Sequence, residues 1–225
     1  MQPLCFFVSW QGVLTLAYRG FCPTLCALKA NIEALNLGLP KENPGSKWPK
    51  TSLGCLKDNK RLTPDDLQKL NEICRSCSMK LEDAGNTVVR AAAVVLYSCR
   101  SLERVISWHE VAFSATASKV GPSEEEISRV QAVVAEADAP DYWISASKDG
   151  NREQHYRGGF IGATLACKPE LEDINNPKVS GWDMVLPWSC LGVIRQFQKK
   201  VDADLPGMYV WFSEESLHMT LRALT

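Results

Sequence analysis

The sequence has no apolar run that reaches the roughly 18–20 residues needed for a membrane-spanning helix. It also carries almost no net charge: 25 Lys and Arg residues nearly balance 26 Asp and Glu residues, which leaves a formal charge of −1. A chain with so little net charge exerts no strong overall attraction on nucleic acid or on an anionic membrane, whereas a local basic groove stays compatible with it. We therefore expect no membrane association.

Signatures of common cofactors and metals are missing as well. Gly20 and the pair at 158–159 are not followed by the Lys-Ser/Thr of a phosphate-cradling loop. Cys74 and Cys77 have the spacing of a metal or redox pair, but no second such pair exists and both fall inside an expected helix. We predict neither a metal nor a cofactor, and we place these two thiols on a buried helix face.

Evidence for a compartment comes from the cysteines and the N-terminal segment. Nine cysteines, an odd number in a chain that is no small disulfide scaffold, predict reduced and mostly buried thiols. Residues 1–21 are fairly apolar, but no Lys or Arg precedes Arg19 and Gln11 interrupts the apolar stretch, which disfavours a secretory signal. We expect a cytoplasmic protein, with an organelle or the nucleus left open.

The composition is that of an ordinary globular protein, with 45% hydrophobic and 23% charged residues. The 225 residues suit a single domain over 1–225, which can consist of two lobes. No long low-complexity linker divides the chain. Expected strands and helices alternate without a regular βαβ repeat, so the pattern predicts the α+β class.

Helical spacing and helix-start residues predict helices over residues 23–37, 63–77, 122–137 and 191–204. Runs of β-forming residues predict strands over residues 13–18, 51–56, 91–97, 105–115, 142–147, 159–167, 208–212 and 217–224. We expect 91–97 and 105–115 to form a hairpin, and a polar loop to connect 147 with 159.

Two distant segments resemble each other. Each consists of an expected helix, a Pro/Gly break and a strand, which reads Lys50-Thr51-Ser52-Leu53-Gly54-Cys55-Leu56 in the first copy and His218-Met219-Thr220-Leu221-Arg222-Ala223-Leu224 in the second. Their alignment pairs Lys50 with His218, Ser52 with Thr220, Leu53 with Leu221 and Leu56 with Leu224. A repeat within one chain favours a pseudo-twofold arrangement, in which the two strands face one groove.

The residue types in these strands suit a phosphate ester. Residues two apart on a strand point to the same face, so His218 projects with Thr220, and Lys50 projects with Ser52. An imidazole can accept or donate a proton, hydroxyls can donate hydrogen bonds to non-bridging oxygens, and an ammonium can hold the phosphate charge. This chemistry requires no metal.

At these residues the sequence resembles the two-histidine (2H) phosphoesterase superfamily, and in particular the plant and algal proteins described as the RNA ligase/cyclic nucleotide phosphodiesterase family. The hallmark of the superfamily is a pair of His-x-Thr/Ser-x motifs, one per lobe, on strands that line a central cleft. His218-Met219-Thr220-Leu221 matches one motif fully. Lys50-Thr51-Ser52-Leu53 matches the other in its hydroxyl and its leucine.

The resemblance implies a two-lobed fold, with antiparallel sheets in pseudo-twofold symmetry around a central groove and helices on the outside. It implies a metal-independent cyclic phosphodiesterase that opens 2′,3′-cyclic nucleotides, RNA ends or ADP-ribose cyclic phosphate. His218 becomes general acid or base, and Ser52 and Thr220 become phosphate ligands. Lys50 stands where the second histidine belongs; with an ordinary pKa of about 10.4 it is protonated and acts as an acid or a phosphate clamp.

Because a lysine stands at position 50 instead of the second histidine of the family motif, other functions remain open. A nucleotide- or RNA-binding module without turnover, or a protein-interaction module, is compatible with the same fold. Trp48 and Trp211 flank the motif strands and either stack a base or pack in the core. His109 is a further proton carrier if its strand lines the groove, although we favour a half-buried structural histidine. His155 is expected in a solvated loop.

Overall fold

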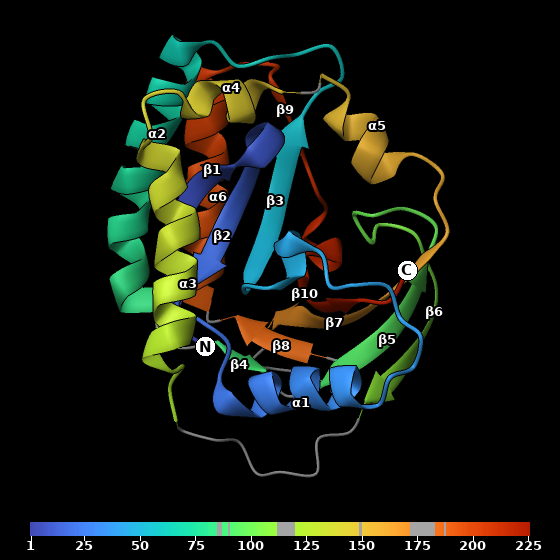
Figure 1. The fold of residues 1–225 in the computed structure, drawn as a ribbon. Coiled ribbons are helices and arrows are strands. Elements are labelled where there is room, and N and C mark those ends of the chain that lie inside the picture. The colour runs from blue at the N-terminus through green and yellow to red at the C-terminus, as the bar shows by residue number, and fades with distance from the viewer. Residues whose placement is uncertain (85–86, 90, 112–119, 149, 172–182, 187) are drawn as a thin grey trace.

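The structure is a computed structural model of the 225-residue chain, and it describes every residue except 85–86, 90, 112–119, 149, 172–182 and 187. Within the described residues, ten strands form one sheet that is antiparallel except where β7 meets β8 (Figure 1). Helices flank this sheet, so the α+β class predicted from the sequence is confirmed. No helix in the described part of the chain combines the length and the apolar character needed to cross a membrane.

The helices are α1 (Pro23–Ala34), α2 (Pro64–Ser78), α3 (Glu124–Ala135), α4 (Tyr142–Ser147), α5 (Arg152–Arg157) and α6 (Trp188–Asp204). The strands are β1 (Pro3–Ser9), β2 (Val13–Tyr18), β3 (Lys50–Leu56), β4 (Val88–Val89), β5 (Ala92–Tyr97), β6 (Val105–Val111), β7 (Gly162–Leu171), β8 (Asp183–Leu186), β9 (Tyr209–Trp211) and β10 (Met219–Ala223). The four predicted helices and most of the predicted strands are confirmed. The end of the strand predicted over 105–115 lies outside the described residues.

The start of α2 shows how directly a local sequence can specify structure. The Thr63 hydroxyl accepts a hydrogen bond from the Asp66 backbone amide (3.1 Å), and the Asp66 carboxylate accepts one from the Thr63 amide (3.0 Å). This capping box satisfies amides that have no partner inside the helix. Cys74 and Cys77 lie on the buried face of α2, as predicted.

Two sequence predictions are wrong between residues 142 and 159. The segment 142–147 is the helix α4 rather than a strand, because Tyr142 and Ala146 are buried one helical turn apart and the Tyr142 hydroxyl donates to the Val8 carbonyl (3.0 Å). The predicted polar loop that follows contains α5. Tertiary contacts therefore override the β-forming character of Tyr142 and its neighbours.

The strand order β1-β2-β3-β10-β7-β5-β6 divides the sheet at the contact between β3 and β10. We call β1, β2, β3 and β9 the first half-sheet, and β10, β7, β5 and β6 the second half-sheet. The halves join where Thr51 pairs with Met219. Gly54 allows β9 to approach β3 closely, since a Cβ at this position would lie 2.6 Å from the Val210 carbonyl oxygen.

The first half-sheet is covered on both faces. Phe6 of β1 stacks on Phe197 of α6 with 4.4 Å between ring centroids, whereas its neighbour Phe7 points the other way and packs with Val130 of α3. β1 thus has no polar face, and its sequence lacks the alternation of polar and apolar residues by which a half-buried strand is predicted. Figure 1 shows α2, α3 and α6 grouped beside this half, and α1 beneath β10, β7 and β5.

A buried arginine ties the second half-sheet to the loop before β3. Arg222 of β10 is 1% exposed, forms an ion pair with Glu33 of α1 at 2.8 Å, and donates to the Pro40 carbonyl (2.6 Å). Lys29 of α1 likewise donates to the Leu221 carbonyl and pairs with Glu42 of the loop. These contacts hold residues 35–49 against the end of β10.

Replacing Arg222 with methionine should lower the free energy of unfolding by roughly 2–4 kcal/mol, because the ion pair of the buried guanidinium with the half-exposed Glu33 is lost, together with its charge-assisted hydrogen bonds to the Pro40 and Ala223 carbonyls. Urea unfolding followed by circular dichroism measures this loss. The control is Arg195→Met, which removes an exposed ion pair with Glu214 and should leave the midpoint almost unchanged. Equal stability of Arg222→Met and the native chain would contradict the role given to this contact.

Candidate functional site

The two motif strands meet at their matching positions. Thr51 and Met219, which the internal alignment makes equivalent, pair with each other across the junction of the half-sheets. In an antiparallel pair this register places Ser52 opposite His218. A pseudo-twofold axis at the junction would produce the same pairing, because it relates each residue to its own equivalent.

Burial alternates along both strands. Thr51 and Met219 are fully buried on one side of the sheet, where the Thr51 hydroxyl lies 3.0 Å from that of Tyr18. The motif side chains on the other side are half-buried: Lys50, Ser52, His218 and Thr220. The alternation shows that these four side chains share one face of the sheet.

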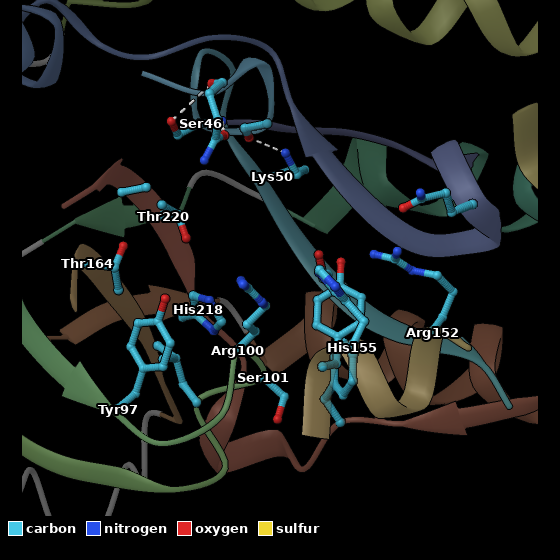
Figure 2. Close-up of a pocket in the computed structure, with 18 residues that line it drawn as sticks. Ser46, Lys50, Tyr97, Arg100, Ser101, Arg152, His155, Thr164, His218 and Thr220 are labelled. Atoms are coloured by element: carbon cyan, nitrogen blue, oxygen red, sulfur yellow. Dashed lines mark hydrogen bonds between the residues drawn. The ribbon is translucent and has the colours of Figure 1, made fainter. Parts of the chain in front are cut away.

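All four of these side chains line one cavity of about 620 Å³. Small-molecule sites commonly measure about 300–1,000 Å³, so the cavity has room for a nucleotide-sized ligand. Figure 2 shows Lys50, Thr220 and His218 around a common space, with Arg100 and Arg152 also at its edge. The sequence placed these four side chains around one groove, and the structure brings them together.

The charged residues of the cavity are all basic. Lys50, Arg100 and Arg152 line it, and no Asp or Glu is found among the described residues of its wall. The whole chain has a formal charge of −1, so this concentration of cations is local. A concave surface with charges of one sign attracts ligands of the opposite sign, which here are anions.

His218 is arranged to accept a proton. Its Nδ1 lies 2.8 Å from the Ser216 carbonyl oxygen. A carbonyl can only accept, so Nδ1 carries the hydrogen and Nε2 of the neutral ring is left as a base. Burial, followed by the charge of Lys50, lowers the pKa of His218, and the hydrogen bond to Ser216 opposes this change. The imidazole is therefore neutral near pH 7.

Lys50 is an unusual lysine. Its ammonium lies 4.2 Å from the centroid of the Trp48 ring and donates to the Gly45 carbonyl. Burial, with a smaller contribution from the charge of Lys29, lowers the pKa of Lys50 to about 8. Such a group is still protonated at neutral pH but releases its proton far more readily than an exposed lysine.

The two hydroxyls differ in their surroundings. The Thr220 hydroxyl makes no hydrogen bond to any residue in the described part of the chain. Ser52 lines the cavity together with Tyr156, whose pKa is raised by burial while the charge of Arg152 and the interaction with Ser52 oppose the shift. Tyr156 thus keeps its proton and can orient the Ser52 hydroxyl.

Two strained residues border the cavity. Gln11 and Leu102 have φ angles of +61° and +56°, in the left-handed region that such side chains rarely adopt. The other described non-glycine residues with positive φ are Asn36 and Asn59, a residue type that tolerates this conformation. Strained backbone is concentrated at functional sites, so the two outliers support a functional role for this cavity.

The sequence analysis missed the contribution of α5. Arg152, His155 and Tyr156 line the cavity from this helix, at the i, i+3, i+4 spacing of a single helix face. His155 is exposed, but the prediction that it lies in a loop is wrong. The spacing was visible in the sequence, whereas nothing in the sequence marked Arg100, which reaches the cavity from the turn between β5 and β6.

The two tryptophans have different positions. Trp211 does not line the cavity: its ring stacks on Tyr209, and its Nε1 donates to Asp202 (3.0 Å). The structure therefore gives no support to base stacking on Trp211, because this indole is held against its own half-sheet and α6. Trp48 lines a smaller cavity that adjoins the first.

His109 lies exposed on β6 and is not part of the cavity wall, so it neither serves the site nor matches the half-buried histidine expected. Among the described residues, no group of three or more His, Cys, Asp or Glu side chains could hold a metal ion. All nine cysteines are unpaired, and six of them are buried.

Comparison with models of known protein families, with curated proteins and with solved structures gave no match. The resemblance to the two-histidine phosphoesterases therefore depends on the motif residues and on the geometry described above.

Proposed function

We propose that this protein is a metal-independent cyclic phosphodiesterase with the two-lobed, pseudo-twofold fold of the two-histidine phosphoesterases. Its substrates would be 2′,3′-cyclic nucleotides, cyclic phosphates at RNA ends, or ADP-ribose cyclic phosphate. One observation carries the proposal: two paired strands supply an imidazole, an ammonium and two hydroxyls to a single cavity whose charged residues are all cations. The pairing of equivalent residues at the junction supports the symmetry.

The reaction would use His218 as base and Lys50 as acid. A water oxygen adds to phosphorus as the bond from phosphorus to one ribose oxygen breaks. His218 Nε2 takes the water proton, and the Lys50 ammonium gives a proton to the departing ribose oxygen. His218 is then protonated and Lys50 neutral, and exchange of one proton with solvent restores both groups.

The other cavity residues would stabilise the charge on phosphorus. Ser52 and Thr220 can donate hydrogen bonds to the two non-bridging oxygens. Arg100 and Arg152 would offset the negative charge that increases in the transition state. No step requires a metal, because these donors bind an anion directly.

Turnover of 2′,3′-cyclic nucleotides, followed by ³¹P NMR, tests the proposal. We expect conversion to a single phosphate monoester at a rate that EDTA does not change. Loss of activity on chelation would contradict the metal-independent mechanism. Calorimetric binding without any product would favour the alternative of a nucleotide- or RNA-binding module, which the lysine at position 50 keeps open. Absence of affinity for every phosphate would favour a protein-interaction module.

The pH dependence of kcat/KM should be bell-shaped. The base acts when deprotonated, so activity rises through the pKa of His218, which lies below its usual 6.5. The acid acts when protonated, so activity falls as pH passes the Lys50 pKa of about 8. Initial rates across this range measure both limbs. A profile that stays level well above this pKa would exclude Lys50 as the acid.

A further inference from the structure

A second cavity of about 150 Å³ adjoins the first and shares with it Gln11, Gly45, Lys50, Ser52, Arg152 and Tyr156. We call it the ring slot. Its other walls are mainly apolar or aromatic and come from β1, the turn after it, β2, the loop before β3, α3 and α4: Phe7, Ser9, Trp10, Val13, Trp48, Val133 and Tyr142. If the phosphate of a ligand lies between the motif strands, the part of the ligand attached to that phosphate could therefore reach into this slot.

The volume of the slot limits what it can hold. An apolar cavity of about 150 Å³ in another protein accommodates benzene, which is a single six-membered ring. A pyrimidine base is one such ring, whereas a purine is two fused rings. The slot therefore fits a pyrimidine, and a purine would have to remain outside it or displace the walls.

Gln11 adds a polar edge to the ring slot. Its side chain lines both cavities, its backbone is strained, and it makes no hydrogen bond to any residue that the structure describes. A carboxamide presents a donor and an acceptor side by side. Rotation by half a turn exchanges the two, so Gln11 can match the N3 and O4 edge of uracil or the N3 and N4 edge of cytosine.

From the slot's size, its aromatic walls and the position of Gln11, we propose that it receives the base of a pyrimidine nucleotide whose phosphate occupies the main cavity. The inference deepens the proposed function and depends on it. The ribose would span the shared wall at Lys50 and Ser52. The protein would then bind cytidine and uridine nucleotides in preference to adenosine and guanosine nucleotides, because the slot has room for one ring only.

Calorimetry with nucleoside 3′-phosphates tests the proposal, because these product-like ligands bind without turnover. We expect the cytidine and uridine compounds to bind about tenfold more tightly than the adenosine and guanosine compounds, a difference of about 1.4 kcal/mol. Gln11→Ala should lower pyrimidine affinity. Val133→Phe should fill the slot and remove the preference, whereas Ala132→Phe, at an exposed neighbour on the same helix, should retain it.

The outcomes separate the two claims. Equal affinity of the native chain for pyrimidine and purine nucleotides, with binding of inorganic phosphate intact, would overturn the slot and leave the proposed function standing. Absence of binding by every nucleotide and by inorganic phosphate would overturn both. Near-ultraviolet circular dichroism identifies a variant that has failed to fold, and Gln11→Ala then provides the independent test of the slot.

Discussion

Replacing His218 with alanine should lower kcat for a 2′,3′-cyclic nucleotide by about 10³-fold, within the range of roughly 10²–10⁴ that a positioned general base contributes. The substitution removes the Nε2 that the hydrogen bond at Nδ1 leaves ready to accept a proton. KM should change little, since the cations and hydroxyls proposed to bind the phosphate are still present. Steady-state kinetics separates these two constants.

His109→Ala is the matched control, because this histidine is exposed on β6 and lies outside the cavity. It should retain the kcat of the native chain. If His218→Ala were as active as this control, His218 would not be the base, and the assignment of the site would be wrong.

Replacing Lys50 with methionine should lower kcat/KM by about 10²–10³-fold, because both the proposed general acid and a charge proposed to bind phosphate are lost. Lys50→Arg retains the charge but does not release a proton at neutral pH, so it should recover KM and not kcat. Both variants should also lose the fall in activity that begins near pH 8. Rates measured across pH distinguish the two contributions.

The control for Lys50 is Lys47→Met, which removes an exposed ammonium three residues earlier in the chain. It should behave as the native chain does. A comparable loss in this control would mean that the general basic charge of this surface matters, rather than the proton carried by Lys50.

Burial would let Lys50 serve as the acid in the proposed mechanism, in place of a second histidine. An exposed lysine holds its proton too firmly to be an efficient acid near neutral pH. The ammonium of Lys50 is enclosed between Trp48 and the Gly45 carbonyl, and its pKa falls to about 8. In the proposed mechanism this proton would be available to a leaving alkoxide without a second imidazole.

The sequence predicted the elements whose determinants are local. The capping residues of α2 lie within four positions of each other, and the residues of each motif lie two apart on one strand. The repeat also predicted that Lys50 and His218 would meet, because duplicated segments commonly pack about an axis. The first two arguments require only short-range geometry, whereas the third uses the similarity of two distant segments.

The remainder of the site depends on the tertiary fold. Arg100 reaches the cavity from a turn whose position is held by the ion pair of Glu103 with Arg157 of α5 (2.8 Å), 54 residues apart in the chain. The polar sequence of α5 resembles that of a loop, and its role becomes visible only when the helix is placed beside β3. For Trp211 the sequence left base stacking and core packing open, because closeness in sequence to a motif strand does not fix the direction of an indole.

The central claim is that one phosphate binds between the two motif strands, and a crystal structure with a bound nucleoside 3′-phosphate tests it most directly. Our account predicts phosphate oxygens within about 3.2 Å of Lys50 Nζ, Ser52 Oγ and Thr220 Oγ1, and of His218 Nε2 in crystals acidic enough for this nitrogen to hold the proton that it takes in the reaction. A phosphate that contacts only one of the two strands, or that lies outside this cavity, would contradict it.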